Sequence, residues 1–189
     1  MFRFIKNKLP FLWQIIEYFN SFLCNLFYKN KMQLIRARLT ESIFGQFKIE
    51  YADLNKIDIF TSYLLAISEE DKKYFRPFIY QDKAIKTFLK NSSILVFTLC
   101  YKNDIAGVFF LRFFFIGQAY LGFYTDKKFR GMGLGSKMIK SLVIACKEQS
   151  FPLYSTVSTE NTASWKAHIS NGFKVKKQMK NNYILLKFC

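Results

Sequence analysis

Arg130-Gly131-Met132-Gly133-Leu134-Gly135-Ser136 is the stretch that decides the fold, because its three alternating glycines lie between two regular patterns. An apolar, aromatic run from Tyr120 to Tyr124 precedes it and is typical of a strand. A helix start is indicated by the apolar spacing of Leu134, Met138, Leu142 and Ala145. Glycine lets a backbone approach a ligand closely, and free N–H groups at a helix start bind anions. The stretch therefore predicts a strand, a glycine loop and a helix that together hold a diphosphate.

Two other glycine cradles do not fit this stretch. The dinucleotide fingerprint G-x-G-x-x-G needs its last glycine one residue after Gly135, and no acidic ribose partner is evident downstream. The nucleotide P-loop needs a lysine directly after its last glycine, whereas Ser136 follows Gly135. The sequence thus disfavours both kinds of nucleotide site.

The spacing Arg130-x-x-Gly133-x-Gly135 resembles the R-x-x-G-x-G cradle of the GNAT superfamily, whose members are acyl-CoA-dependent N-acyltransferases. The next element of that family reads N-x-x-[AS], then usually a tyrosine four residues on, then G-F. At these spacings this chain has Asn161, Ser164, His168, Gly172 and Phe173. The motifs resemble the family between residues 120 and 173, and the element order does so from residue 47 to residue 188. The resemblance implies an α/β fold with a central, mostly antiparallel mixed sheet, one splayed strand pair and flanking helices.

The resemblance also implies how acetyl-CoA, or another acyl-CoA, would be held as co-substrate. The cradle amides would hold its diphosphate, with Lys127, Lys128 and Lys137 adding positive potential. The strand before the cradle would pair with the pantetheine arm and polarise the thioester carbonyl through one N–H. Asn161 would contact that arm, cap a helix, or do both. The implied carrier-binding residues are Phe123, Tyr124, Thr125, Arg130, Gly131, Met132, Gly133, Leu134, Gly135, Ser136, Asn161 and Ser164.

His168 is where this chain departs from the family pattern, which usually has a tyrosine as general acid. It lies four residues after Ser164, so both side chains share one face of the predicted helix. Imidazole donates protons near neutral pH, which makes His168 the predicted catalytic donor to the leaving thiolate. The alternative is a solvent-facing histidine, with water carrying the proton. The general base stays undecided between a chain of water molecules and the side chains of Asp126, Glu160, Tyr120 and Tyr154.

These motifs predict transfer of an acyl group, acetyl by preference, from coenzyme A to a primary amine within one ternary complex. Residues 67–78 loosely resemble amino-sugar acyltransferases of surface-polysaccharide pathways, which points to an amino sugar as acceptor. A protein N-terminal or lysine amine is the alternative acceptor. Outside the enzymes, the alternatives are a membrane-associated acyl-CoA-binding protein and a binder of single-stranded nucleic acid. Nucleic acid is disfavoured because the aromatic residues fall in predicted buried strands.

Composition limits the class of protein. The chain has 189 residues, 51% of them hydrophobic and 19% aromatic, which suffices for the core of one domain with a short appendage. A net charge of +16 favours an anionic partner such as a phosphate-bearing ligand, a membrane surface or nucleic acid. The alternative is that the lysines only keep an aromatic-rich chain soluble. The cysteines form neither a C-x-x-C pair nor a cluster with histidine. We therefore expect no metal site, and reduced thiols in the cytoplasm, at Cys24, Cys100, Cys146 and Cys189.

Residues 1–32 are expected to form a basic, apolar helix ahead of an acyltransferase domain over residues 33–189. Three cations in the first eight residues precede an apolar run over residues 11–28. Glu17 opposes a membrane-spanning helix, and no cleavage site of a secretory signal is clear. The pattern is typical of a helix in the membrane interface, here at the cytoplasmic face, or of a helix packed on protein. Its polar residues form a narrow stripe of Gln14, Glu17, Ser21 and Asn25, with Asn20 beside them.

The remaining pattern predicts the framework of the domain. Helices are expected from Asp53 to Ser68 and over residues 81–90, with residues 33–45 as a lead-in. The resemblance implies that these early helices and their connection form the acceptor side of the cleft. Residues 69–71 are expected at a solvated helix start, and Arg76 is either a surface arginine or an acceptor contact. Continuous apolar runs predict strands that helices cover on both faces, over residues 47–51, 94–101, 105–115, 119–125, 153–158, 173–179 and 183–188.

Overall fold

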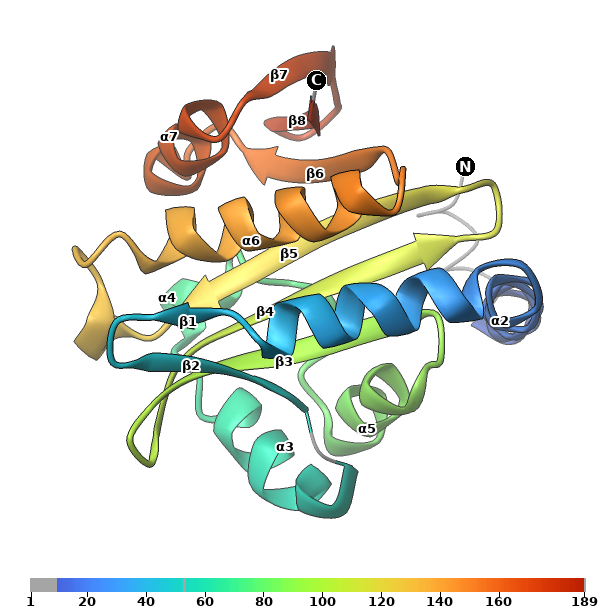
Figure 1. Cartoon of the computed structure of the whole chain (residues 1–189), viewed down its shortest axis with the longest axis horizontal. Coiled ribbons are helices and arrows are strands. Elements are labelled where there is room, and N and C mark those ends of the chain that lie inside the picture. Colours follow the sequence, from blue (N-terminus) through green and yellow to red (C-terminus); the bar gives the residue numbers. More distant parts are fainter. Residues whose placement is uncertain (1–9, 53, 189) are drawn as a thin grey trace.

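An eight-stranded sheet forms the centre of the computed structural model, which describes residues 10–52 and 54–188 (Figure 1). Its strands lie in the order β1-β2-β3-β4-β5-β6-β8-β7. Every neighbouring pair is antiparallel except β5 and β6, which are parallel. The mostly antiparallel mixed sheet expected from the sequence is thereby confirmed. The strands are β1 (Ile43–Phe44), β2 (Phe47–Tyr51), β3 (Ile94–Tyr101), β4 (Asp104–Phe114), β5 (Gln118–Thr125), β6 (Leu153–Ser158), β7 (Phe173–Gln178) and β8 (Tyr183–Phe188).

Helices cover both faces of this sheet. The second part of α2 packs with α6 on one face, and α3 packs with α5 on the other. Two short 3-10 turns, η1 (Leu54–Lys56) and η2 (Lys127–Phe129), precede α3 and the glycine loop. The helices are α2 (Pro10–Thr40), α3 (Ile57–Leu65), α4 (Glu69–Lys72), α5 (Asp82–Lys90), α6 (Leu134–Glu148) and α7 (Thr162–Ser170).

Consecutive residues of the central strands contribute to two separate cores, since side chains alternate across a sheet. On β3, Phe97 joins the core beneath α2 and α6, while Val96 joins the core beneath α3 and α5. On β4, Phe109 and Val108 divide in the same way. The rings of Phe97 and Phe109 stack with their centroids 5.3 Å apart. Burial from both sides therefore explains why these strands read as continuous apolar runs.

The parallel pair β5 and β6 separates soon after it begins. Along these two described strands, only Ala119 with Leu153 and Tyr120 with Tyr154 are paired in register, although β5 continues to Thr125. Beyond these pairs, the edge of β5 that faces β6 has no strand partner. This separation opens the sheet directly before the glycine loop, as the expected splayed strand pair requires.

The helix α2 continues past residue 32 and ends at Thr40. Met32, Ile35 and Leu39 lie at helical spacing and are buried against the sheet and α6. The lead-in expected over residues 33–45 is therefore wrong up to Thr40, because these side chains keep the segment helical. The proposed division of the chain into two units at residue 32 stays a prediction.

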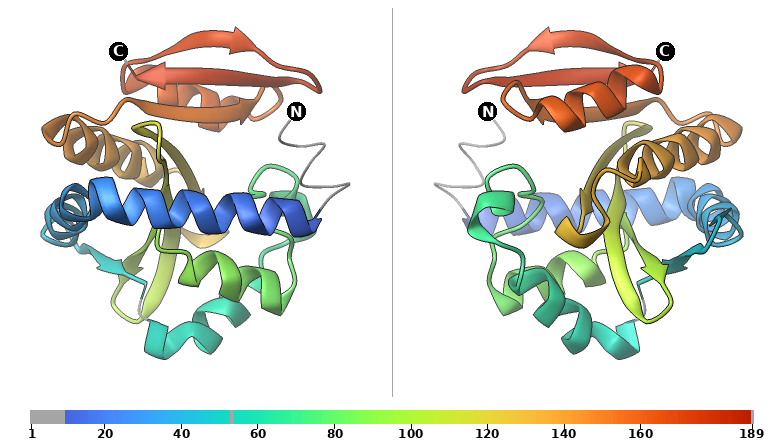
Figure 2. Two further views of the ribbon diagram at one scale, coloured as in Figure 1. Left: turned by 90° about the vertical axis from the view of Figure 1, so that its right-hand side faces the viewer. Right: turned by 90° about the vertical axis from the view of Figure 1, so that its left-hand side faces the viewer.

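The two parts of α2 run in different directions. Figure 1 shows the first part end-on and the second part lengthwise, whereas the left panel of Figure 2 shows the first part lengthwise. Within residues 10–52 and 54–188, no helix combines the length and the hydropathy that crossing a bilayer requires. The expected cations of residues 1–8, the helix cap at Asp53 and the thiol of Cys189 lie outside the described residues.

Candidate functional site

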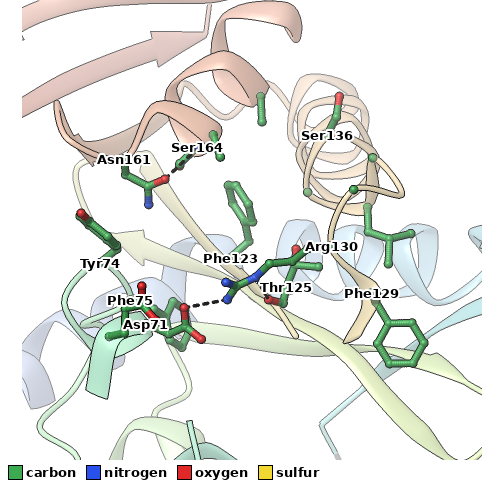
Figure 3. Close-up of a pocket in the computed structure, with 17 residues that line it drawn as sticks. Asp71, Tyr74, Phe75, Phe123, Thr125, Phe129, Arg130, Ser136, Asn161 and Ser164 are labelled. Carbon is green, nitrogen blue, oxygen red and sulfur yellow. Dashed lines mark hydrogen bonds and ion pairs between the residues drawn. The ribbon is translucent and has the colours of Figure 1, made fainter. Parts of the chain in front are cut away.

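A cavity of about 550 Å³ lies at the opening between β5 and β6 (Figure 3). Its volume is in the range of small-molecule sites, about 300–1,000 Å³. Its wall comes from the glycine loop with the start of α6, the end of β5, the start of α7, and α4 with the two aromatic residues that follow it. The expected carrier-binding residues in this wall are Phe123, Thr125, Arg130, Gly131, Gly133, Leu134, Gly135, Ser136, Asn161 and Ser164.

The three glycines of the loop have two different functions. Gly131 and Gly133 have φ values of +80° and +70°, in the left-handed region that favours glycine. A Cβ added to either would meet no described atom within 4 Å, so both positions border open space. A Cβ added to Gly135 would instead lie 2.9 Å from Cε2 of Phe123. Two glycines thus shape an open loop, and the third lets α6 pack on β5.

The start of α6 offers unpaired backbone donors. Gly133 is the N-cap residue, and among the described residues no side chain caps this end. The first helical hydrogen bond runs from Lys137 N to Gly133 O at 3.1 Å. The N–H groups of Leu134, Gly135 and Ser136 therefore lack acceptors within the helix, at the positive end of its dipole. No acidic residue lies in the first turn, so this end of α6 fits a diphosphate.

Alternate residues of β5 direct their backbone groups to the opening. Ala119 N donates to Pro152 O at 3.0 Å, and Leu121 O accepts a bond from Ser155 Oγ at 3.4 Å. Both partners lie on the β6 side of β5. Because strand residues alternate with a period of two, the backbone of Phe123 faces the same side. The edge that pairs with β6 at its start is therefore available for a ligand further along.

Tyr124 and Met132 are expected carrier contacts that lie outside the cavity wall. Asp126 N donates to Ala106 O of β4 at 2.9 Å, so the period of two directs the backbone of Tyr124 to β4 as well. The ring of Tyr124 packs in the core beneath α3 and α5. Met132 is 52% exposed. Their carrier-binding roles stay predictions.

Arg130 joins the loop to α4 across the cavity. Its Nε donates to Thr125 O at 3.2 Å, and its Nη2 donates to Asp71 Oδ1 at 2.7 Å. Asp71 Oδ2 also accepts bonds from Ser68 Oγ at 3.0 Å and from Tyr124 Oη at 3.3 Å. Burial opposes ionisation of Asp71, but the bonds from Arg130 and Ser68 outweigh it and lower the pKa of this carboxyl below its usual range. Burial, followed by the charge of Asp71, raises the pKa of Tyr124 to about 12.

The resemblance placed the early helices and their connection on the acceptor side of the cleft, but the sequence did not indicate that residues of α4 line the cavity. The sequence interpretation treated residues 69–71 as a solvated helix start, which holds for Glu69, whose side chain is 88% exposed, but not for Asp71, at 10%. The available signal was the spacing of Ser68 and Asp71, a capping box in which Asp71 N donates to Ser68 Oγ at 3.3 Å. Arg76 is exposed and donates from Nε to Lys72 O at 2.7 Å, outside the wall. The wall residues that were not predicted are Glu70, Asp71, Tyr74, Phe75, Phe129, Ala163 and Ala167.

The four side chains considered as general base have other partners in the described structure. Asp126 caps η2 by accepting a bond from the backbone of the second residue after it. Glu160 accepts a bond from Asn182 Nδ2 at 3.2 Å. The rings of Tyr120 and Tyr154 stack with centroids 5.2 Å apart, where β5 and β6 still pair. The cavity wall includes none of the four among the described residues.

Asn161 and Ser164 bring the start of α7 to the cavity. Asn161 Oδ1 accepts a bond from Ser164 N at 3.0 Å, so this residue is the helix cap. Figure 3 shows the nitrogen of the same side chain directed into the cavity. Ser136 Oγ accepts a bond from Asn171 Nδ2 at 2.7 Å, which ties the start of α6 to the end of α7. The cap therefore leaves an amide donor facing the position of a ligand.

His168 lies directly behind the cavity wall. It is 1% exposed, with its ring centroid 5.6 Å from that of Phe123 and 5.1 Å from that of Phe173, so the alternative of a solvent-facing histidine is wrong. Its Nδ1 is 2.8 Å from Ser164 O and 3.5 Å from Ser164 Oγ. Nε2 has no hydrogen-bond partner among the described residues. Burial lowers the pKa of His168, and the bond to Ser164 only partly opposes this. Its catalytic role stays a prediction.

The pH dependence of stability should report on this buried imidazole, which is the one histidine of the chain. The folded protein favours the neutral ring, whereas the unfolded chain takes up a proton below about pH 6.5. The free energy of unfolding should therefore fall as the pH drops through that value. His168→Phe keeps a ring between Phe123 and Phe173 but cannot titrate, so the fall between about pH 7 and about pH 5 should shrink. Urea unfolding measures this difference, and an equal fall in both proteins would contradict it.

Comparison with known proteins places these features in a wider context. A family model described as the acetyltransferase (GNAT) family matches residues 58–173. No curated protein gives a sequence match to the chain. The match spans α3 to the start of β7 and therefore includes both motifs that line the cavity.

Solved structures share the fold at low sequence identity. RimL, a ribosomal L7/L12 alpha-N-protein acetyltransferase in complex with coenzyme A, is 14% identical with a TM-score of 0.66, over 77% of this chain and 94% of that chain. Ribosomal-protein-S5-alanine acetyltransferase from Vibrio fischeri is 14% identical with a TM-score of 0.64, over 77% and 93%. N-acetyltransferase PseH from Campylobacter jejuni is 15% identical with a TM-score of 0.54, over 76% and 97%. At such identities the likeness concerns the fold.

Proposed function

Because the chain belongs to the acetyltransferase (GNAT) family, we propose that it transfers an acetyl group from acetyl-CoA to a primary amine. Members of this family use acetyl-CoA as co-substrate. One observation carries the proposal: the open glycine loop and the uncapped start of α6 border the same cavity as the unpaired edge of β5. Free cysteines at positions 24, 100 and 146 support a reaction in the cytoplasm.

In this proposal, the backbone of the chain holds the donor. The amides that begin α6 bind the diphosphate, with Arg130 at the edge of the cradle. Phe123 and Thr125 pair with the amide groups of the pantetheine arm, and the N–H of Phe123 polarises the thioester carbonyl. Asn161 donates to the same arm from the side chain that caps α7. A protonated acceptor first loses one proton to water, since only the neutral nitrogen is a nucleophile. The nitrogen then attacks the carbonyl carbon, the carbon–sulfur bond breaks, and the nitrogen loses a second proton to water.

The leaving thiolate needs a proton, and Ser164 is the proposed donor. Ser164 borders the cavity, and its Oγ is 3.5 Å from Nδ1 of His168. We propose His168 as the positioning residue that orients Ser164 through this contact. Water in the cavity replaces the proton that Ser164 gives to sulfur. His168→Phe should then slow thiol release while acetyl-CoA affinity is unchanged. Equal rates of thiol release in the unchanged protein and in His168→Phe would show that water alone supplies the proton to the thiolate.

The α4 wall supports an acceptor that carries positive charge. Glu70 and Asp71 bring two carboxylates to a cavity in a chain of net charge +16. Arg130 Nη2 is 2.7 Å from Asp71 Oδ1, and Lys127 Nζ is 3.2 Å from Glu70 Oε2. The same two cations lie beside the cradle. When a diphosphate attracts these cations, the carboxylates become available to a protonated amine. This exchange favours amine binding after the carrier is in place.

We propose an amino sugar of a surface-polysaccharide pathway as the acceptor. The support is the loose resemblance of residues 67–78 to amino-sugar acyltransferases, together with the position of Asp71, Tyr74 and Phe75 from this segment in the cavity wall. A protein amine is the second candidate, because RimL acts on a ribosomal protein and has a similar fold.

Turnover with a panel of amines tests the proposed function. The purified chain would be mixed with acetyl-CoA and separately with amino sugars, N-terminal peptides and lysine peptides, and thiol release would be followed. We expect release with amino sugars to exceed release with either peptide class. Faster thiol release with peptides would identify a protein amine, and not an amino sugar, as the acceptor. Binding of acetyl-CoA without turnover of any amine would indicate a binding protein instead of an enzyme.

A further inference from the structure

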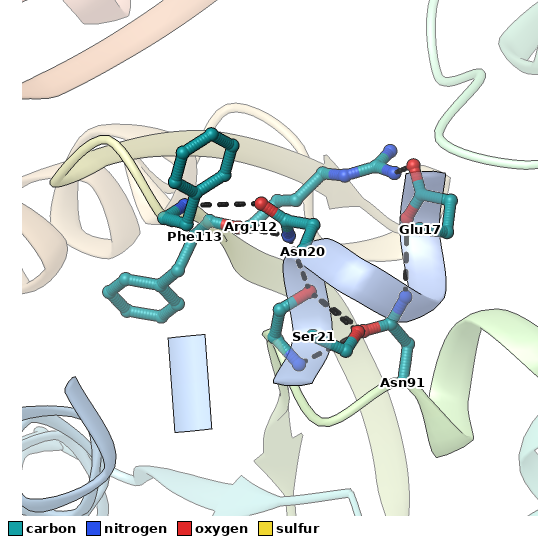
Figure 4. Close-up of polar contacts among 8 residues, drawn as sticks. Glu17, Asn20, Ser21, Asn91, Arg112 and Phe113 are labelled. Carbon is teal, nitrogen blue, oxygen red and sulfur yellow. Dashed lines mark hydrogen bonds and ion pairs between the residues drawn. The ribbon is translucent and has the colours of Figure 1, made fainter. Parts of the chain in front are cut away.

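The first part of α2 directs polar side chains to the domain, which is the reverse of a usual surface helix (Figure 4). Asn20 is 6% exposed. Its Nδ2 donates to Ser93 Oγ at 3.2 Å and to Phe113 O at 3.0 Å, and its Oδ1 accepts a bond from Phe115 N at 3.1 Å. These bonds satisfy backbone groups at the end of β4, so the polar side of the helix has to face inward.

Two further residues of the stripe extend this contact. Ser21 Oγ donates to Asn91 Oδ1 at 2.7 Å, and Asn25 Nδ2 donates to Ser92 Oγ at 2.8 Å. Both acceptors belong to the loop between α5 and β3. The polar stripe therefore fixes how α2 is rotated about its axis.

Glu17 completes the inward side as an ion pair. It is the one acidic residue among residues 1–40, and it pairs with Arg112 of β4. It also accepts a bond from Asn91 Nδ2 at 3.3 Å. The side chains of Glu17 and Arg112 are only 18% and 20% exposed, so the pair is largely withdrawn from water. The outer side of the helix is left without negative charge.

The outer side of the same segment carries large apolar side chains. Phe11 is 75% exposed and Tyr18 is 77% exposed, and monomeric proteins rarely expose many apolar side chains in one contiguous patch. The β4–β5 turn adds to them, because Tyr28 Oη donates to Phe115 O at 3.2 Å and brings that turn beside α2. We define the α2 apolar face as the exposed residues Phe11, Leu12, Ile15, Tyr18, Phe19, Phe22, Leu26, Phe27, Phe115 and Ile116.

We propose that the α2 apolar face docks on the surface of an anionic phospholipid bilayer. Residues 1–31 contain five cations, namely Arg3, Lys6, Lys8, Lys29 and Lys31. Cations at both ends of an apolar helix face match the headgroup and acyl layers of an anionic membrane. A second copy of the chain would instead bring another net charge of +16 to a face that has no acidic residue to attract it. Charge therefore favours lipid over self-association.

The docked helix would lie along the membrane surface. Its inner side stays bound to the domain through Glu17, Asn20 and Ser21, so docking requires no unfolding. The β4–β5 turn would enter the same layer through Ile116, which is 61% exposed. The inference is independent of the acetyl transfer proposed above, because it uses no residue of the cavity wall.

Co-sedimentation of the full chain with vesicles tests the proposal. We expect binding to phosphatidylcholine vesicles that contain phosphatidylserine to exceed binding to phosphatidylcholine alone by about 10-fold or more. Phe19→Gln/Phe22→Gln should lose about 10-fold or more of that affinity, since both side chains are exposed members of the face. Ile116→Gln should also weaken binding, and it provides a second variant outside α2.

A matched control changes two exposed apolar residues elsewhere. Ile43→Gln/Ile59→Gln alters side chains that are 69% and 71% exposed and lie outside the α2 apolar face, so it should bind vesicles like the unchanged chain. The proposal is overturned if the full chain binds neither vesicle, or if the control and the Phe19/Phe22 variant lose the same affinity. It is also overturned if sedimentation shows a dimer that the Phe19/Phe22 variant dissociates and that vesicles do not bind.

Discussion

Gly133→Val should abolish binding of acetyl-CoA, with affinity falling by about 100-fold or more. The substitution puts a β-branched side chain into the open space that the φ value of +70° maintains at the start of α6. Each charge-assisted hydrogen bond between a backbone amide and the diphosphate contributes about 1.5–3 kcal/mol of binding free energy. The loss of two such bonds accounts for the fall of about 100-fold in affinity. Calorimetric titration with coenzyme A measures the change.

Gly45→Val is the matched control for this variant. Gly45 lies between β1 and β2 with a φ of +64°, and an added Cβ there also meets no described atom within 4 Å. Both substitutions should therefore cost a similar backbone strain, about 1–3 kcal/mol of stability. Gly45→Val should nevertheless bind coenzyme A like the unchanged protein. Unaltered affinity in Gly133→Val would place the carrier elsewhere and remove the basis for the proposed reaction.

Asp71→Asn should raise the KM for the amine by about 10- to 100-fold, the loss expected for one hydrogen bond to a charged group. The pKa of Asp71 is lowered, so the carboxylate is charged throughout the neutral range and can attract a protonated acceptor. The affinity for coenzyme A should be retained, because the backbone of the cradle does not depend on this side chain. Steady-state rates at several amine concentrations separate KM from kcat.

Glu69→Gln is the control for the α4 wall. Glu69 lies on the same helix and carries the same charge, but it is 88% exposed and its partner is Lys72. Its loss should leave the KM for the amine unchanged. If Asp71→Asn instead weakened coenzyme A binding and lowered the unfolding temperature together, Asp71 would act by holding Arg130, and the proposed acceptor contact would be wrong.

Most of the framework could be predicted from the sequence, because local patterns determine it. The strands β3 to β8 begin and end within about one residue of the predicted ranges, since apolar runs and turn residues mark them directly. The glycine loop could be predicted for a similar reason: positive φ at Gly131 and Gly133 is a local backbone requirement. Their meeting with Asn161 and Ser164 in one cavity was implied by the resemblance of both motifs to the GNAT superfamily.

The inward position of Asp71 in α4 could not be predicted, because it depends on a contact between distant residues. Asp71 and Arg130 are 59 residues apart in sequence, and the capping-box spacing of Ser68 and Asp71 indicates a local bond but not the contact with Arg130. His168 shows the same limit. Helical spacing placed it beside Ser164, but only the packing of Phe123 and Phe173 shows that this part of the helix is buried.

The orientation of α2 was undetermined for a related reason. The helical pattern identified a polar stripe, and three of its residues, together with Asn20 beside it, make the contacts that hold the helix to the domain. Their partners in β4 and in the loop after α5 are themselves ordinary polar groups in the sequence. A periodic pattern reports which side chains share a face, and the partner determines which way that face points.

The separation of β5 from β6 has a consequence for how the fold avoids aggregation. An unpaired strand edge normally invites another polypeptide to add to the sheet. Here the two incomplete edges belong to one molecule and face each other, and the last complete pair, Tyr120 with Tyr154, keeps them at a fixed spacing. A slender extended molecule with its own amide groups suits that interval better than a second chain with side chains on both faces. Most proteins must shield an unpaired strand edge from other chains. In this sheet the unpaired edges instead determine which shape of ligand can enter between β5 and β6.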